Sequence, residues 1–151
     1  MSAAFAVSPL VLYAVDDWAL TADLDLTPWA DALMVRPDIG MVRLGPPHPD
    51  LTGTVVMLPE GWALRLDRHH FANATRPFLA HRRFYDAYGW YDEEQSAYEC
   101  ERLHNLRYAH APAGLPDVVL ALPHPWIHVG EAEVGDITPG EELLTDEAVT
   151  L

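Results

Sequence analysis

The sequence predicts a mainly β fold with one main helix. Short runs of valine, leucine, isoleucine and aromatic residues recur along the chain, turns containing glycine or proline separate them, and one segment has clear helical periodicity. The chain has 151 residues, of which 50% are hydrophobic, so it can form a single domain with its own core. The strand candidates are residues 9–15, 32–36, 41–44, 54–58, 62–66, 117–122, 127–129 and 133–137.

The main helix is predicted over about residues 77–88. Its aromatic and histidine residues follow one another at spacings of three or four, which places them on one helix face. They are Phe78, His81, Tyr85 and Tyr88. Gly89 can end this helix, because glycine readily adopts the backbone conformation found just after a helix. The aromatic stripe is therefore interpreted as core.

A shorter helix is predicted over residues 28–33. Pro28 fits the first helical turn, and Thr27 before it can cap the free backbone N–H groups. Residues 90–107 show no single apolar face, so they predict no definite element.

A β-hairpin is predicted from two strands around a short turn. Residues 54–58 and 62–66 are separated by a Pro-Glu-Gly sequence, which is typical of turns. The alternation of Trp62, Leu64 and Leu66 predicts that these three side chains point inward from the second strand.

The chain is strongly acidic, and all of its cations are arginine. It has 23 aspartate and glutamate residues against nine arginines and no lysine, which gives a net charge of −14. This charge disfavours binding to nucleic acid and favours a basic protein or lysine-rich peptide as partner. The absence of lysine excludes a phosphate-binding P-loop and a lysine that forms a Schiff base.

Cysteine, histidine and hydropathy patterns predict a cytoplasmic protein without a metal site. Cys100 is the only cysteine, so no internal disulfide can form, and we expect it to be buried. His124 and His128 have a spacing seen in some zinc sites, but no cysteine pair accompanies them. No apolar run is long enough to cross a bilayer, and we expect no membrane association.

Several segments of the chain resemble motifs of the SET domain, of the short kind found in bacteria and viruses. Residues 135–143, GDITPGEEL, resemble the closing R-D-I-x-x-G-E-E-L stretch of that family. Residues 84–92, FYDAYGWYD, are similar to its R-Y-G-W/Y-x-D stretch, and residues 102–105, RLHN, stand where the family has R-F-x-N. Residues 35–40 and 51–56 resemble its two glycine-containing turns. The motifs occur in the order found in the family.

The resemblance implies a particular form of the mainly β fold. SET domains are assemblies of small β-sheets in which the C-terminal segment threads beneath a preceding loop. Residues 33–151 would form the SET-like domain, and residues 1–32 would be an N-terminal extension packed on it. The helix over about residues 77–88 would be the main helix of this assembly.

The resemblance also implies a function, protein-lysine methylation with S-adenosylmethionine as the methyl donor. Asn105, Arg102 and Gly40 would contact this cofactor. The catalytic group beside the lysine channel would comprise Glu147, Asp146 and Tyr108.

The chain departs from the family at two catalytic motifs. The family's N-H-S becomes Asn105-Leu106-Arg107, and Glu147 stands where the family has its catalytic tyrosine. A glutamate there would stabilise a protonated lysine, which cannot act as the nucleophile. The alternative is therefore a catalytically inactive SET-like acidic module that binds a basic protein.

Overall fold

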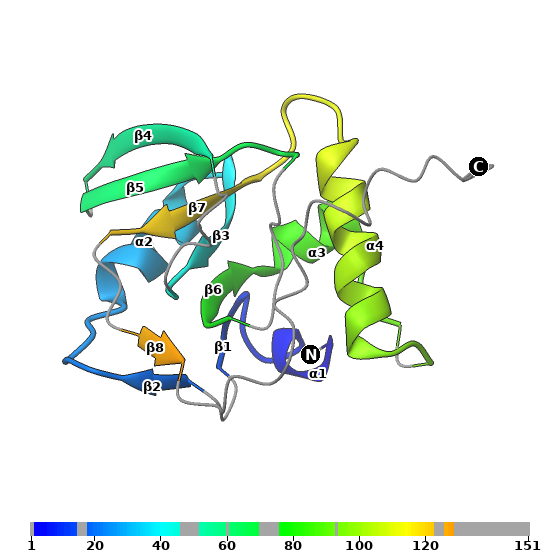
Figure 1. Cartoon of the computed structure of the whole chain (residues 1–151), viewed down its shortest axis with the longest axis horizontal. Helices are drawn as coiled ribbons and strands as arrows, with labels where there is room; N and C mark the ends of the chain where they lie inside the picture. Colours follow the sequence, from blue (N-terminus) through cyan, green and yellow to red (C-terminus); the bar gives the residue numbers. More distant parts are fainter. Residues whose placement is uncertain are drawn as a thin grey trace.

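A computed structural model describes residues 2–14, 18–45, 52–59, 61–69, 76–92, 94–122 and 126–128. Within these ranges most of the strands form one large sheet, and the helices pack around it (Figure 1). In chain order the elements are α1 (Ser2–Phe5), β1 (Leu10–Tyr13), β2 (Trp18–Leu20), α2 (Thr27–Val35), β3 (Ile39–Arg43), β4 (Gly53–Leu58), β5 (Gly61–Leu66), β6 (Phe78–His81), α3 (Arg82–Tyr88), α4 (Ala97–Ala109), β7 (Asp117–Ala121) and β8 (Trp126–His128). The prediction of a mainly β fold is confirmed.

The large sheet has six strands in the order β1-β6-β3-β7-β5-β4, and β2 pairs with β8 in a separate two-stranded sheet. β3 and β7 run parallel, whereas the other neighbouring strands are antiparallel. The predicted hairpin is confirmed, because β4 and β5 pair along their whole length. β1 and β4 form the two edges of this mixed sheet (Figure 1).

The hydrophobic core lies on both faces of the sheet. One cluster joins the sheet to α1, α3 and α4 and includes Phe84, Tyr85 and Tyr108. The other joins the opposite face to α2 and includes Trp29 and Leu33. Because helices cover both faces, all five residues of the central strand β3 are buried. Such strands are continuously apolar and lack the alternation of a strand with one wet face.

The prediction of a main helix over about residues 77–88 is wrong in its first half. Phe78–His81 is strand β6, and the helix begins only at Arg82. The His81 ring caps this helix by accepting a hydrogen bond from the backbone N–H of Arg83 at 3.0 Å. β6 lies between β1 and β3 with both faces covered, so its unbroken apolar run has no strand period. The longest helix is instead α4.

Three further local predictions need correction. Residues 32–36 were predicted as a strand, but α2 continues through Val35, and Thr27 is its first helical residue, not a capping side chain. Trp62 does not point into the core, since 52% of it is exposed. At the turn end of the hairpin the neighbouring Ala63 is buried in the cluster on the α2 side, whereas on the Trp62 face the side chain buried in the core is Leu66, at 3% exposure.

The predicted strand over residues 133–137 and the threaded C-terminal segment lie outside the described residues. The assignment of residues 1–32 to an extension stays a prediction, although β1 is hydrogen-bonded into the six-stranded sheet and Phe5 is buried in its core. Among the described residues, no helix has the length and hydropathy needed to span a membrane.

Candidate functional site

Helix α4 carries three of the predicted site residues, Arg102, Asn105 and Tyr108. Ser96 begins it by accepting a hydrogen bond from the backbone N–H of Glu99 at 3.2 Å. Asn105 and Tyr108 lie one turn apart on its sheet-facing side and are 5% and 0% exposed. The structure therefore brings these two predicted residues together inside the protein.

The hydroxyl group of Tyr108 is used to anchor α4 to the sheet. It accepts a hydrogen bond from the backbone N–H of Val118 at 3.0 Å, near the start of β7. The Arg68 guanidinium lies 5.5 Å from the centre of the Tyr108 ring. Burial raises the pKa of Tyr108 above its ordinary value, so the phenol is neutral at physiological pH. This tyrosine is a structural anchor in the described arrangement.

A charged pair lies close to these residues, between α4 and the sheet. Arg43 follows Met41 on the sheet face that α4 covers, and it is 3% exposed. Glu101 precedes Asn105 by one turn of α4 and interacts electrostatically with Arg43. Burial raises the pKa of Glu101 to about 7, although Arg43 opposes this shift, and burial lowers the pKa of Arg43 to about 9. A half-buried carboxyl group that titrates near neutral pH is a candidate acid or base.

Arg102 and Gly40 are not part of this group. Arg102 is exposed and forms a two-pronged ion pair with Glu99, with N–O distances of 3.0 and 2.7 Å. Gly40 was predicted in a turn but lies in β3, which begins one residue earlier. Its backbone packs so closely that an added Cβ would stand 2.8 Å from the Cβ of Pro116 and 3.1 Å from that of Phe84. In this arrangement Gly40 serves close packing of β3.

Replacing Gly40 with alanine is expected to lower the free energy of unfolding by about 2 kcal/mol, because the new methyl group overlaps two packed side chains. Urea denaturation measures this change. The matched control is Gly45→Ala, where the nearest atom lies 3.4 Å away, and we expect a change below about 0.5 kcal/mol. Equal stabilities of the two variants would contradict the packing role.

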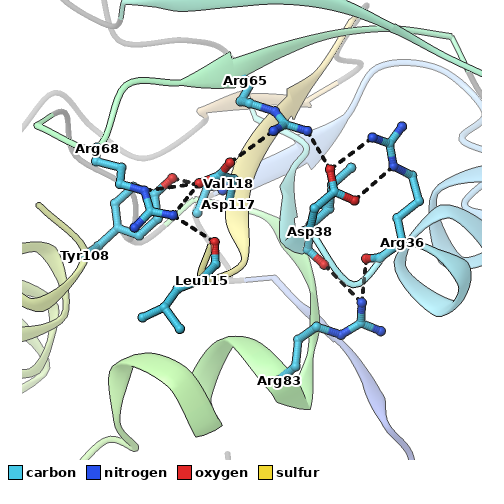
Figure 2. A network of polar contacts seen from close by, with 10 residues as sticks. Arg36, Asp38, Arg65, Arg68, Arg83, Tyr108, Leu115, Asp117 and Val118 are labelled. Atoms are coloured by element: carbon cyan, nitrogen blue, oxygen red, sulfur yellow. Dashed lines mark hydrogen bonds and ion pairs between the residues drawn. The ribbon is translucent and has the colours of Figure 1, made fainter. Parts of the chain in front are cut away.

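Sequence reasoning missed a polar network at the amino ends of β3 and β7, which Figure 2 shows. Asp38 immediately precedes β3, and Asp117 begins β7. Arg65 bridges them, with N–O distances of 2.7 Å to Asp38 and 3.2 Å to Asp117. Arg36 completes the Asp38 side, and Arg68 completes the Asp117 side. The network thus alternates three guanidinium groups with two carboxylates.

The network acts as a clamp between segments that are distant in the sequence. Arg36 and Arg65 hold the pKa of Asp38 at about 2, well below its ordinary value, so this carboxylate stays ionised. A fourth arginine, Arg83, secures the turn before β3 by donating to the backbone carbonyl oxygens of Arg36, Ile39 and Leu33. Because the carboxylates are already engaged by arginines, the network fits a structural role better than acid–base catalysis.

Two sequence signals could have revealed these features. A Pro-Asp pair stands at the start of both strands, at residues 37–38 just before β3 and at residues 116–117, where the aspartate begins β7. The backbone N–H of Asp117 donates to the carbonyl of Asp38 at 2.8 Å. Ser96 and Glu99 form the S-x-x-E pattern of a helix start, which marks α4.

The remaining predicted site residues, Asp146 and Glu147, lie outside the described residues, as do His124 and the 135–143 motif. Cys100 is buried at 5% exposure, as predicted. In the part of the chain that the structure describes, no three histidine, cysteine, aspartate or glutamate side chains gather as metal ligands.

Comparison with known proteins identifies no relative of this chain. No protein family model, no curated protein and no solved structure matches the chain. The resemblance to SET domains therefore remains a prediction from the sequence motifs. The structure adds α4, Arg43 and the arginine–aspartate network to the candidate features.

Proposed function

We propose that this protein binds a basic protein partner through its carboxylate-rich surface, without a catalytic step. The observation that carries this proposal is the separation of charge along the chain. All nine arginines lie between Arg36 and Arg107. Residues 129–151 contain no arginine, lysine or histidine. The carboxyl groups of this C-terminal stretch are Glu131, Glu133, Asp136, Glu141, Glu142, Asp146 and Glu147.

Most of the arginines are engaged by partners in the folded body. Three of them share the two carboxylates of the network, and Arg83 is bound to backbone carbonyl groups. Arg82 and Arg102 pair with acidic residues on their own helices. Ion pairs of this kind balance charge within the described body, and the sequence of residues 129–151 carries its seven carboxyl groups without a cation of its own.

The geometry favours binding over methyl transfer. A lysine channel needs hydroxyl groups that can face the incoming amine. The hydroxyl of Tyr108 instead accepts from Val118, and that of Tyr88 donates to the carbonyl of Pro116 at 2.7 Å. Electrostatic attraction of a basic protein requires none of these groups.

The proposal predicts that charge at the C-terminal stretch, and not net charge alone, sets the affinity. We expect a variant with Glu141→Gln, Glu142→Gln and Glu147→Gln to bind a short oligolysine peptide about tenfold more weakly at low salt. Isothermal titration calorimetry at two salt concentrations measures both the affinity and its electrostatic part.

The matched control neutralises three exposed carboxylates of the folded body, with Asp23→Asn, Asp31→Asn and Glu94→Gln. Both variants lose the same amount of charge, so we expect the control to keep the affinity within about twofold. Equal losses in the two variants would show that the attraction is general, and absence of binding to the wild-type protein would refute the proposal.

A second candidate, S-adenosylmethionine-dependent protein-lysine methylation on a SET-like fold, is favoured by one observation. Asn105 and Tyr108, which the resemblance gives to the cofactor and the lysine channel, are buried one turn apart on α4. Asp146 and Glu147 would complete that channel.

Titration with S-adenosylmethionine tests this candidate in the same instrument. Saturable heat together with transfer of a labelled methyl group to a lysine-rich protein would establish it. Absence of heat at millimolar cofactor would leave the binding module alone.

A further inference from the structure

Strand β4 is an exposed edge of the six-stranded sheet. It ends the strand order, and β5 is its hydrogen-bonded neighbour among the described strands (Figure 1). The six residues Gly53–Leu58 contain no charge and no proline. Proteins commonly protect edge strands with lysine, proline or a bulge, because a bare edge can pair with another extended segment. β4 has none of these features, as its pairing with β5 is regular throughout.

An apolar surface lies next to this edge. Val55 and Met57 of β4 are 59% and 62% exposed, and Trp62 of β5 is 52% exposed. Met57 pairs directly with Trp62, and Val55 pairs with Leu64, so the exposed side chains share one face of the hairpin. Exposed apolar side chains gathered at one place are typical of a protein-binding surface.

A described carboxylate lies beside the start of the uncharged strand, and the sequence of the turn after the strand contains another acidic residue. Asp67 is exposed, and it accepts a hydrogen bond from the Thr52 hydroxyl at 2.7 Å, one residue before β4. At the other end, Glu60 follows two residues after Leu58 in the sequence of the hairpin turn. This distribution of charge selects among the segments that could pair with the edge.

A second copy of the chain is disfavoured by this arrangement. Antiparallel pairing of two β4 strands about a two-fold axis would bring Asp67 of each copy to the hairpin turn of the other, whose sequence contains Glu60. Like charges facing each other across strands are destabilising. A segment with basic residues beyond both ends of an apolar centre meets opposite charges at each end.

We propose that β4 binds an extended segment of the basic partner as a seventh strand of the sheet. The segment has an apolar, alternating centre that spans the six residues of β4, about 20 Å, and an arginine or lysine beyond each end. The inference rests on the proposed function, because it assigns one docking edge to the basic partner.

The experiment uses a fluorescein-labelled ten-residue peptide with a Val-Thr-Val-Thr-Val-Thr centre and two arginines at each end. We expect its anisotropy to rise on binding to the full chain. Met57→Lys should weaken this binding at least about tenfold, because it places a charge on the apolar face beside the edge. The matched control is Leu12→Lys, which adds the same charge to a partly exposed position of the other edge strand, β1, and should change the affinity less than about twofold.

Hydrogen exchange of the wild-type protein tests the same proposal without a substitution. Saturating peptide should slow exchange of the β4 amides at least about tenfold, whereas those of β1 should be unaffected. Equal weakening by both lysine variants, or unchanged β4 exchange, would overturn the docking edge while oligolysine binding still supports the proposed function. A dimer in sedimentation that Met57→Lys dissociates would overturn it in favour of self-pairing.

Discussion

Replacing Arg68 with alanine is expected to lower the free energy of unfolding by about 2–4 kcal/mol, somewhat below the range of about 3–5 kcal/mol for removing one partner of a fully buried ion pair, because this network is partly exposed. The Arg68 side chain is 20% exposed and donates to Asp117 at 2.8 Å. It also donates to the backbone carbonyl oxygens of Ala111, Pro112 and Leu115. Its removal therefore leaves several acceptors without their donor in the segment that leads into β7.

Chemical denaturation measures this loss, and two further variants separate its causes. Arg68→Lys keeps the charge but not the planar fork, so its stability should fall between those of the wild type and the alanine variant. Arg102→Ala removes an exposed ion pair with Glu99, and it should cost less than about 1 kcal/mol. If Arg68→Ala were no more destabilising than Arg102→Ala, the clamp would contribute little to the fold.

A double-mutant cycle with Asp117→Asn locates the interaction. Residues in one hydrogen-bonded network show coupling energies of about 0.5–3 kcal/mol, and we expect a value in the upper half of this range for Arg68 and Asp117. Arg65 also binds Asp117, so Asp117→Asn should still be destabilising when Arg68 has already been replaced.

The strands with local signals were predictable from the sequence, whereas the elements around the site were not. The β4–β5 hairpin and β7 combine apolar runs with nearby turn residues. Residues close in the sequence therefore determine where these strands begin and end. Helix α4 instead turns His104 and Asn105 into the core, both under 6% exposed. Polar residues on the buried side erase the apolar periodicity by which an amphipathic helix is recognised.

The position of the boundary between β6 and α3 could not be predicted from local sequence, because it depends on how β6 pairs in the sheet. Aromatic residues at helical spacing run through Phe78 and Tyr88, but pairing of β6 with both β1 and β3 fixes its extended form. The arginine–aspartate network is also a product of topology, since Asp38 and Asp117 meet only because β3 and β7 run parallel. The cofactor and channel roles from the SET resemblance remain predictions, because they depend on contacts with Asp146 and Glu147.

The stability of the wild-type protein is expected to fall less between about pH 7 and pH 4 than the titration of His104 alone would give, because the half-buried Glu101 on the same helix titrates with the opposite effect. Burial, with a smaller effect of Arg107, lowers the pKa of His104 from 6.5 to about 4. Its contribution is complete above pH 6.5 and is lost as the pH falls to about 4, a loss of about 3 kcal/mol. Burial raises the pKa of Glu101 from 4.5 to about 7, so acidification over the same range removes a penalty. That gain is roughly 1–2 kcal/mol after allowance for solvent screening.

Glu101→Gln should therefore expose the titration of His104. Above pH 7 this variant should be more stable than the wild type by roughly 1–2 kcal/mol, since the partly buried carboxylate is gone. Between pH 7 and 4 it should lose about 3 kcal/mol, a steeper fall than that of the wild type. The control Glu94→Gln removes an exposed carboxylate and should follow the wild-type profile. Thermal or urea denaturation across this range measures the slopes, and NMR titration of the His104 ring gives its pKa directly. Two results would contradict this prediction. One is a His104 imidazole that titrates near pH 6.5, and the other is a Glu101→Gln variant whose unfolding free energy changes with pH no more than that of the wild type.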